Sequence, residues 1–269
     1  MTTELSIATF NCENLFSRPA IFEQSEEKSK ELLAYVDELK AELKKPVFDH
    51  DEIGRLTDAL NGYATINDIR GKAASAPGAK EWLGYVSLEK TSFEDAAVDN
   101  VAHVIADTGA DIVCLVEVED RITLKGFHND ILVKGFLKKA KKKPYTQIMC
   151  VQGNDGRGIN VAAMSRYPIR WMKSHADDRT DKNTPVFSRD CLELNIAIPG
   201  PVPLHLLLNH FKSMGYSSKD DPQGNKRRLV QSTRVSEILD EHDLSREYVV
   251  VAGDFNAPAT SPSLAPVLG

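Results

Sequence analysis

The stretch YVVVAGDFN, residues 248–256, joins an apolar run to a glycine, an acid and an amide. Residues 248–251 are the β-branched and aromatic types that favour a buried strand. Asp254 and Asn256 follow at once, where an acid or amide is usually a solvated turn residue or a helix N-cap. A single polar residue at a strand end is more often structural than catalytic. Whether Asp254 and Asn256 are functional therefore depends on whether other strands also end in polar residues.

Four other apolar segments also carry polar groups at or near an end. They are Asn11, Glu13 and Asn14 after ATF; Glu117, Glu119 and Asp120 in CLVEVED; Asp155, Arg157 and Asn160 before a strand; and Asn209, His210, Lys212 and Ser213 after LHLLL. Because central strands of a sheet lie side by side, these ends are expected to converge on one crevice. Carboxylates, amides and a histidine suit a hard divalent cation such as Mg²⁺ and acid–base or electrostatic chemistry on a phosphate.

Length and composition indicate one large domain of an ordinary globular protein. The chain has 269 residues, of which 42% are hydrophobic and 27% charged, and its formal net charge is -6. The chain has no overall positive charge that would indicate nucleic-acid binding, although a local basic patch is compatible with a negative net charge. The four cysteines form no CxxC pair, which favours free thiols and a reducing compartment. With no signal peptide or membrane-spanning run in the sequence, we expect a cytoplasmic protein.

The periodicity of apolar residues predicts two packed sheets flanked by helices. Helices are expected over residues 26–45, 51–60, 93–109 and 225–242, the last with Asn225 as its N-cap, and residues 61–92 are expected to be irregular. The basic run 137–143 is interpreted as a solvated helix end. Strands are expected over residues 5–11, 111–119, 145–151, 158–165, 168–174, 186–198, 202–211 and 248–255.

The ordered motifs ATFNCENLF, CLVEVED, GNDGRGINVAAMSRYPI, NHFKS and AGDFN resemble the endonuclease/exonuclease/phosphatase superfamily, which has the deoxyribonuclease-I-like fold. The resemblance covers residues 5–16 and 99–264, and it is to bacterial members that begin FNxENLF. It implies an α+β fold, a four-layer α/β/β/α sandwich of two packed mixed sheets. Residues 1–269 would then form a single domain, with a helical insertion at about residues 18–98.

The resemblance also implies roles for individual residues. Asn11 and Glu117 match the family's metal-holding positions, and Val116 stands where the family usually has a supporting Gln. His210 would bind a phosphate oxygen or help to protonate the leaving group, while Asp254 would orient or deprotonate the attacking water beside Asn256. Substrate-binding roles are implied for Arg157, Asn160 and Lys212, with Asp155 orienting Arg157. As alternatives, Lys212 is interpreted as a solvated lysine and Arg189 as a member of a strand ion pair.

No Ser-Asp-His tripeptide occurs in the chain, although the family normally carries one on its final strand. By resemblance, the last strands of one sheet are missing from the sequence. Three explanations stay open at this point: a truncated chain, a partner that completes the sheet, or a member that has lost catalysis. An exposed sheet edge would then favour association with a partner or with a second copy.

The leading hypothesis is a metal-dependent phosphodiester hydrolase that uses Mg²⁺, with Mn²⁺ as a substitute. It would most simply be a nuclease, either an endonuclease or an exonuclease, with DNA or RNA as its partner. A phosphatase or phosphodiesterase acting on a non-nucleic substrate is the alternative within the enzyme class. A binding subunit that keeps the fold and part of the site is the alternative outside it. A plain structural domain would leave the five polar strand ends unexplained.

Overall fold

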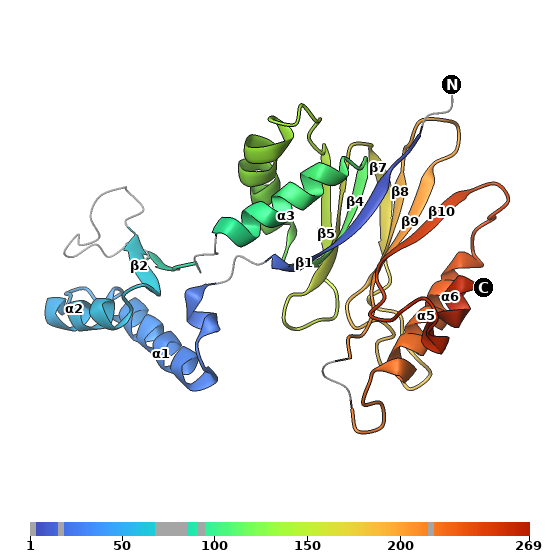
Figure 1. Cartoon of the computed structure of the whole chain (residues 1–269). Coiled ribbons are helices and arrows are strands. Elements are labelled where there is room, and N and C mark those ends of the chain that lie inside the picture. Colours follow the sequence, from blue (N-terminus) through green and yellow to red (C-terminus); the bar gives the residue numbers. More distant parts are fainter. Residues whose placement is uncertain (1–3, 16–18, 68–84, 91–94, 215–217) are drawn as a thin grey trace. The chain divides into compact units, whose positions relative to one another are not determined.

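The computed structural model of the chain describes residues 4–15, 19–67, 85–90, 95–214 and 218–269 (Figure 1). These residues form two compact units, one of Met1–Phe16 with Asp95–Gly269 and the other of Ser17–Glu94. The larger unit contains the candidate site, and each unit is described by itself.

The larger unit is built on two four-stranded sheets with the same pattern of pairing. Each has a parallel pair at one side, followed by two antiparallel pairings. The first sheet has the order β1-β4-β6-β5, with bounds Ile7–Leu15, Ile112–Val118, Asn160–Ser165 and Gln147–Val151. The second has the order β10-β9-β8-β7, with bounds Tyr248–Asp254, Leu204–His210, Cys191–Ile196 and Ile169–Ser174.

The two sheets pack face to face through an apolar core. Alternate residues of β4, β6, β8 and β9 fill this core, as the period of two in a strand requires. Its buried members are Ile112, Cys114, Val116, Val161, Ala163, Leu192, Leu194, Ile196, Leu204, Leu206 and Leu208. The strands of the middle layers are therefore buried on both faces, and β4 and β6 read as nearly continuous hydrophobic runs in the sequence. The outer face of β8 and β9 also carries buried polar residues, among them Glu193 and His205.

Helices cover the outer face of each sheet, and this gives the four layers that the sequence predicts (Figure 1). On the first sheet lie α3 (Asp95–Thr108), α4 (Arg121–Gly126) and the π-helix η2 (Phe127–Leu137). On the second lie α5 (Asn225–Leu239) and the short η3 (Pro262–Leu264), followed by α6 (Ala265–Leu268). The fold class is confirmed as α+β with two packed mixed sheets.

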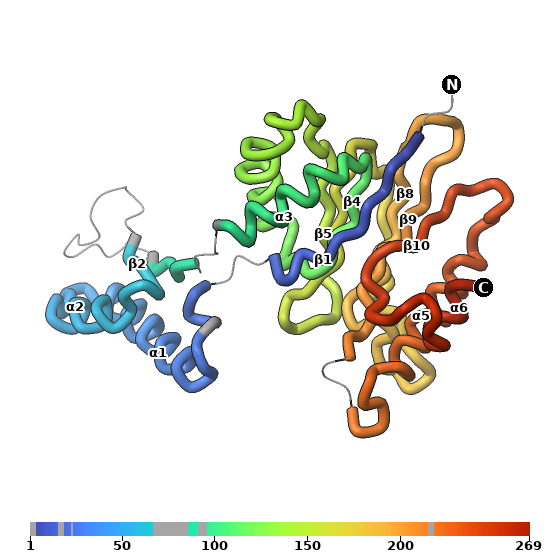
Figure 2. The backbone as a smooth tube through the Cα atoms, in the orientation of Figure 1, coloured from blue at the N-terminus to red at the C-terminus, as the bar shows by residue number. Residues whose placement is uncertain are grey.

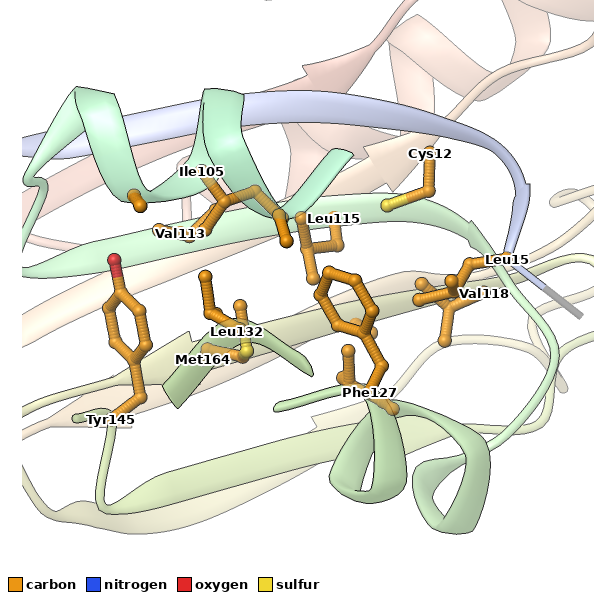
Figure 3. Close-up of a cluster of buried hydrophobic side chains, with 14 of the residues drawn as sticks. Cys12, Leu15, Ile105, Val113, Leu115, Val118, Phe127, Leu132, Tyr145 and Met164 are labelled. Carbon is orange, nitrogen blue, oxygen red and sulfur yellow. The ribbon is translucent and has the colours of Figure 1, made fainter. Parts of the chain in front are cut away.

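The outer core of the first sheet shows how the helices are held (Figure 3). Ile105 of α3 and Phe127 and Leu132 of η2 pack with Leu115 of β4 and Met164 of β6. All five side chains are at most 4% exposed. Burial of a large apolar side chain stabilises the fold by about 1.5–3 kcal/mol, so this cluster fixes the sheet from which Asn11 and Glu117 project.

The smaller unit has a core of its own. It contains η1 (Ala20–Glu23), α1 (Glu26–Glu42), α2 (His50–Ala59) and an antiparallel pair of strands, β2 (Ala64–Asn67) and β3 (Tyr85–Leu88). Leu32, Leu39 and Leu56 lie at the centre of this core and are at most 1% exposed. The expectation of irregular structure over residues 61–92 is wrong for the two strands, and residues 68–84 and 91–92 of that range lie outside the described residues.

Two further local predictions need correction. Gly224, with φ 69°, is the N-cap of α5 in place of Asn225, which begins the helix. The carboxylate of Asp221 accepts hydrogen bonds from the backbone N–H groups of Lys226 and Arg227, at 3.1 and 3.0 Å, and so caps the helix from outside. In addition, the sequence does not predict the helical segment of α4 and η2. In the smoothed trace of Figure 2 this segment lies between β4 and β5 along the chain.

The cysteines are free thiols, as predicted from their spacing. Burial raises the pKa of Cys12, Cys114 and Cys150 to about 12, which makes their thiols unreactive at neutral pH. No helix among the described residues is long and apolar enough to cross a membrane.

Candidate active site

The candidate site lies where the two parallel strand pairs end. Asn11 of β1 and Glu117 of β4 come from the first sheet, and His210 of β9 and Asp254 of β10 come from the second. His210 and Asp254 are direct partners in the parallel register, so both sit at the carboxyl end of their pair. Four side chains that are far apart in the sequence are thereby brought into one group.

Glu117 owes its position to an irregularity in β4. The register with β1 and the register with β6 both shift beside Val116 and Val118, and Glu117 lies in this irregular part of the strand. Its φ of 63° lies in the left-handed region, which a non-glycine residue adopts at a cost of about 1–2 kcal/mol. The distortion turns Glu117 out of the buried ladder, since its neighbours are at most 1% exposed whereas its side chain is 20% exposed.

The amide of Asn11 lies between the two carboxylates. Its Nδ2 donates to Asp254 Oδ2 at 3.1 Å and to Glu117 Oε1 at 3.4 Å. Its Oδ1 accepts from the backbone N–H of Glu13 at 2.9 Å. The amide nitrogen thus supplies the positive end of a dipole between two acids that would otherwise repel one another.

His210 is almost fully buried beneath these acids. Its Nε2 lies 4.0 Å from both Glu117 Oε1 and Asp254 Oδ2, and its ring is 1% exposed. Burial, followed by the nearby charge of Arg189, lowers the pKa of His210 to about 4, although the charge of Asp254 opposes the shift. His210 is therefore neutral at pH 7, and a neutral ring offers one N–H donor to an anion without the cost of a buried cation.

Asp254 and Asn256 are held by their own turn. Asp254 Oδ1 accepts from the backbone N–H of Asn256 at 2.8 Å, and Asn256 Nδ2 donates to the carbonyl of Phe211 at 3.1 Å. Gly253 lets β10 come this close to β9, because a Cβ at that position would lie 1.9 Å from the carbonyl oxygen of Asn209. The Gly-Asp-Phe-Asn sequence therefore combines a close backbone approach with two oriented polar groups.

A pair of arginines shares one carboxylate beside the site. Asp155 accepts from Arg157 Nε at 3.0 Å and from Arg157 Nη2 at 2.8 Å, and it also forms an ion pair with Arg189 Nε at 3.1 Å. Arg189 is 3% exposed and donates to the carbonyl of Phe211 at 3.2 Å. The sequence interpretation of Arg189 as a member of an ion pair agrees with these contacts. What it missed is the burial of Arg189, which brings its charge to bear on His210.

Asn160 and Lys212 are placed differently from the central group. Asn160 is 2% exposed, and its amide accepts from the N–H of Gly153 at 2.9 Å and donates to the carbonyl of Glu119 at 2.6 Å. Both the oxygen and the nitrogen of this amide are thus hydrogen-bonded to backbone groups. The substrate-binding role of Asn160 stays a prediction. Lys212 Nζ donates to the carbonyl of Ser213 at 3.0 Å, and the side chain also lines a cavity.

This cavity, of about 600 Å³, carries an excess of basic groups on its walls. Lys182, Lys212, Lys226 and Arg227 line it together with two acids, Asp181 and Asp221. Burial lowers the pKa of Lys212, and the charges of Arg189 and Arg157 lower it further, so a bound anion there would be favoured electrostatically. Sequence patterns do not predict the cavity, because its lining comes from the connection between β7 and β8, the connection between β9 and α5, and the start of α5.

The donor set suits a hard divalent cation. Glu117 and Asp254 supply carboxylate oxygens at one point, and Mg²⁺ in proteins is usually held by one or two carboxylates together with water. Asn11 would add an amide oxygen after a rotation of its side-chain amide by 180°, which would release Glu13. The structure brings the predicted pair Asn11 and Glu117 together. Asp254, which the sequence analysis assigns to the attacking water, is a further oxygen donor at the same point.

A family model described as the endonuclease/exonuclease/phosphatase family matches residues 87–268, which is more than half of the chain. The chain belongs to this family, whose members are metal-dependent phosphoesterases. The match includes Glu117, His210, Asp254 and Asn256, whereas Asn11 precedes it and joins the site through its geometry alone. A search of curated protein sequences returns no significant match.

Several solved structures are similar to the chain at low identity. Sphingomyelinase C from Streptomyces griseocarneus is 20% identical over 64% of this chain and 61% of its own, with a TM-score of 0.44. A mutant beta toxin from Staphylococcus aureus with bound magnesium ions is 16% identical over 64% and 62%, with a TM-score of 0.39. Truncated TDP2 from Caenorhabditis elegans is 19% identical over 60% and 55%, with a TM-score of 0.38. The chain thus spans about three fifths or less of the length of these proteins, and they say nothing of its substrate.

Proposed function

We propose that this chain is a metal-dependent phosphodiester hydrolase and that its substrate is a nucleic acid. The observation that supports it most is the convergence of Asn11, Glu117, His210 and Asp254 from four strand ends onto one point. Packing does not require two acids, an amide and a buried histidine to meet there. A phosphodiester is anionic and resists nucleophiles, so it needs such a combination of charge neutralisation and an oriented water.

Glu117 and Asp254 would hold Mg²⁺, with the side-chain oxygen of Asn11 as a further donor. When bound, the ion would neutralise the phosphate oxygens and the charge that develops on the leaving oxygen. Mn²⁺, which also prefers oxygen donors, would substitute for it.

The chain's own residues have separate tasks in this proposal. His210, neutral at pH 7, donates from Nε2 to a phosphate oxygen and stays buried throughout. Asp254 orients the attacking water or takes its proton, and Asn256, anchored to the carbonyl of Phe211, holds the neighbouring phosphate oxygen or the water. Arg157 is fixed by two hydrogen bonds from its side chain to Asp155, and this side chain is 48% exposed to solvent. Its positive charge would contact a second phosphate oxygen.

The basic cavity supports a nucleic-acid substrate over a small phosphodiester. A polynucleotide has further phosphates on either side of the bond that is cut, and Lys182, Lys226 and Lys212 offer charges for one of them. The formal net charge of -6 makes such a local patch the main source of attraction. Replacing a lysine that neutralises one phosphate should reduce the slope of log K against log salt by about 0.7–0.9.

The function is tested with two substrates: a polynucleotide, which is long enough to reach the basic cavity, and a small phosphodiester, which is not. With Mg²⁺ or Mn²⁺, the chain should cut plasmid or single-stranded DNA or RNA and should hydrolyse bis-p-nitrophenyl phosphate; a chelator should stop both reactions. Asp254→Asn and Glu117→Gln should lower both activities by about 10²-fold or more, as the loss of a group that acts in the transition state does. Lys182→Ala with Lys226→Ala should raise KM for DNA alone.

The results separate the competing functions. If the folded protein turns over bis-p-nitrophenyl phosphate but no polynucleotide, it is a phosphatase or phosphodiesterase of non-nucleic substrates. If it binds DNA in a salt-dependent way and hydrolyses neither substrate, it is a binding member of the family. Turnover of either substrate that continues in the presence of a chelator would contradict the proposal of a metal-dependent hydrolase.

A further inference from the structure

A second group of metal-ligating side chains lies on the outer face of the second sheet, away from the candidate active site. Glu193 comes from β8, His205 from β9, and His242 from the segment after α5. Leu192 and Leu194 point into the core between the sheets, so Glu193 between them points to the helix layer. His205 precedes His210 by five residues, which places the two about 16 Å apart along the strand.

The three side chains are close together and shielded from water. Glu193 is 4% and His205 9% exposed, and the side chain of His242 is also 9% exposed. His242 Nε2 lies 3.4 Å and His205 Nδ1 3.8 Å from the same oxygen, Glu193 Oε1, and all three ligand atoms lie within 4.8 Å of one another. With zinc bonds of about 2.0–2.2 Å, two ligands of a tetrahedral site are about 3.3–3.6 Å apart. The observed spacing needs little contraction to enclose an ion.

His205 provides a separate observation that points to a missing ligand. Its Nδ1 is buried and has no hydrogen-bond partner among the described residues. A buried polar atom without a partner costs about 1–3 kcal/mol, which a hydrogen-bonded structural histidine would avoid. Because this atom faces Glu193 Oε1 at 3.8 Å, beyond hydrogen-bonding distance, the cluster is not simply a satisfied polar network.

Each of the three side chains also has a second partner that orients it. His242 Nδ1 lies 2.8 Å from Glu247 Oε2, and the neutral tautomer that donates to this carboxylate keeps a lone pair on Nε2 for a metal. Glu193 Oε2 lies 3.5 Å from His175 Nε2, and His205 Nε2 lies 3.1 Å from Asn195 Nδ2. A rotation of the Asn195 amide by 180° would place Oδ1 against Nε2, so that Nε2 donates and Nδ1 of His205 keeps its lone pair for a metal. Supporting contacts of this kind are typical of metal-bound histidines.

We propose that Glu193, His205 and His242 form a second metal site that binds Zn²⁺, with water as its fourth ligand. Two imidazoles and one carboxylate are the ligand set that a borderline ion such as zinc prefers over Mg²⁺. The site would tie the segment after α5 to β8 and β9 and would therefore stabilise the second sheet. It is independent of the proposed hydrolase function and of the residues that carry it.

The site is tested by titrating the whole chain with Zn²⁺ and with Co²⁺, in a Glu117→Gln background that weakens the candidate active site. We expect one equivalent to bind, with the intense visible absorption of four-coordinate cobalt and a rise in Tm on addition of zinc. His242→Asn and Glu193→Gln should each weaken binding by at least about 100-fold. Glu247→Gln, which removes only the negative charge of the partner of His242, should weaken binding by about 10–100-fold.

The control is His103→Asn, because His103 is an exposed histidine of the same unit whose Nε2 lies 3.5 Å from Asp107 Oδ2. It should leave affinity and stoichiometry unchanged. Circular dichroism and unfolding without zinc establish that each variant is folded, and Glu247→Gln carries the test if a ligand variant fails to fold. The proposal is overturned if no equivalent binds in the Glu117→Gln background, or if His242→Asn and Glu247→Gln bind zinc as the parent does.

Discussion

At the scale of the residue, Glu117 combines a functional carboxylate with a strained backbone. Its φ of 63° has no packing reason, since its side chain is 20% exposed while its neighbours fill the core. Asn256, with φ 49°, is the second residue of the proposed site in the left-handed region. Non-glycine residues in this region gather at functional sites, where the surrounding fold enforces the strain.

This strain predicts a trade between stability and activity. Glu117→Gly and Glu117→Gln both remove the carboxylate, but only glycine relieves the positive φ. The free energy of unfolding of Glu117→Gly should therefore exceed that of Glu117→Gln by about 1 kcal/mol, with both variants inactive. Urea unfolding in the presence of a chelator measures the difference. Equal stability of the two variants would show that the backbone is not strained there.

A second residue-scale prediction concerns His128, a histidine that supports the helix layer of the first sheet. Its Nδ1 lies 2.8 Å from Asn129 Oδ1, and its Nε2 accepts from the backbone N–H of Tyr145 at 3.2 Å. Burial lowers the pKa of His128, against the hydrogen bond with Asn129, so the folded protein holds the neutral ring more strongly than the unfolded chain does.

The unfolded chain therefore binds the extra proton first as the pH falls. The contribution of His128 is fully present above its unfolded pKa of about 6.5 and is lost as the pH falls toward the lower pKa of the folded state. His128→Gln keeps an acceptor for Tyr145 but cannot titrate, so its stability should change less between pH 6.5 and pH 5 than that of the parent. Unfolding midpoints across this range test it, and parallel curves would contradict the assignment.

At the scale of the element, the strands were predictable and several helical features were not. Every strand of the two large sheets overlaps a predicted one. The central strands β4, β6, β8 and β9 are buried on both faces, and the edge strands still show as short apolar or β-branched runs between turn residues. The segment of α4 and η2 escaped prediction because a π-helix closes i→i+5 hydrogen bonds and spaces its buried residues more widely than 3.6. Its buried Phe127, Leu132 and Leu137 are five residues apart.

The same limit applies to contacts made over long sequence separations. Lys142, in the run interpreted as a solvated helix end, donates to the carbonyls of Ala106 and Asp107 at 2.5 and 3.2 Å, at the carboxyl end of α3. Composition gives no hint of this contact. In the candidate site, the strand ends that carry Asn11, Glu117, His210 and Asp254 were predictable from sequence, whereas the burial of Arg189 and the closeness of Glu193, His205 and His242 depend on the packed sheet.

Helix α5 offers a prediction at this scale. Its cap is the carboxylate of Asp221, which accepts from two backbone N–H groups of the first turn. These hydrogen bonds outweigh the effect of burial and lower the pKa of Asp221. Asp221→Ala should cost about 1 kcal/mol of the free energy of unfolding, and Asp221→Ser, which keeps a short acceptor, should cost less.

The matched control is Asp220→Ala, which removes the preceding acid and leaves both hydrogen bonds of Asp221 to the first turn in place. Urea unfolding at pH 7 provides the comparison. If Asp221→Ala and Asp220→Ala prove equally stable, Asp221 is not the cap of α5.

At the scale of the whole molecule, the chain has two units with separate cores. The interpretation of residues 18–98 as a helical insertion into a single catalytic domain stays a prediction, as does association at a sheet edge. The candidate active site and the proposed zinc site both lie in the larger unit. The described part of the smaller unit contributes no residue to either.

Because the two units have separate cores, each is expected to unfold locally without the other. Leu56 is fully buried in the core of the smaller unit, and Leu206 is fully buried between the two large sheets. Each Leu→Ala change should cost about 2–5 kcal/mol, but only in the unit that contains it. Hydrogen exchange followed by mass spectrometry should show that Leu56→Ala loses protection in α1 and α2 alone and keeps Mg²⁺-dependent turnover, whereas Leu206→Ala loses protection in β4, β8 and β9. If Leu56→Ala also lowers protection in the sheets, the two units fold as one cooperative body.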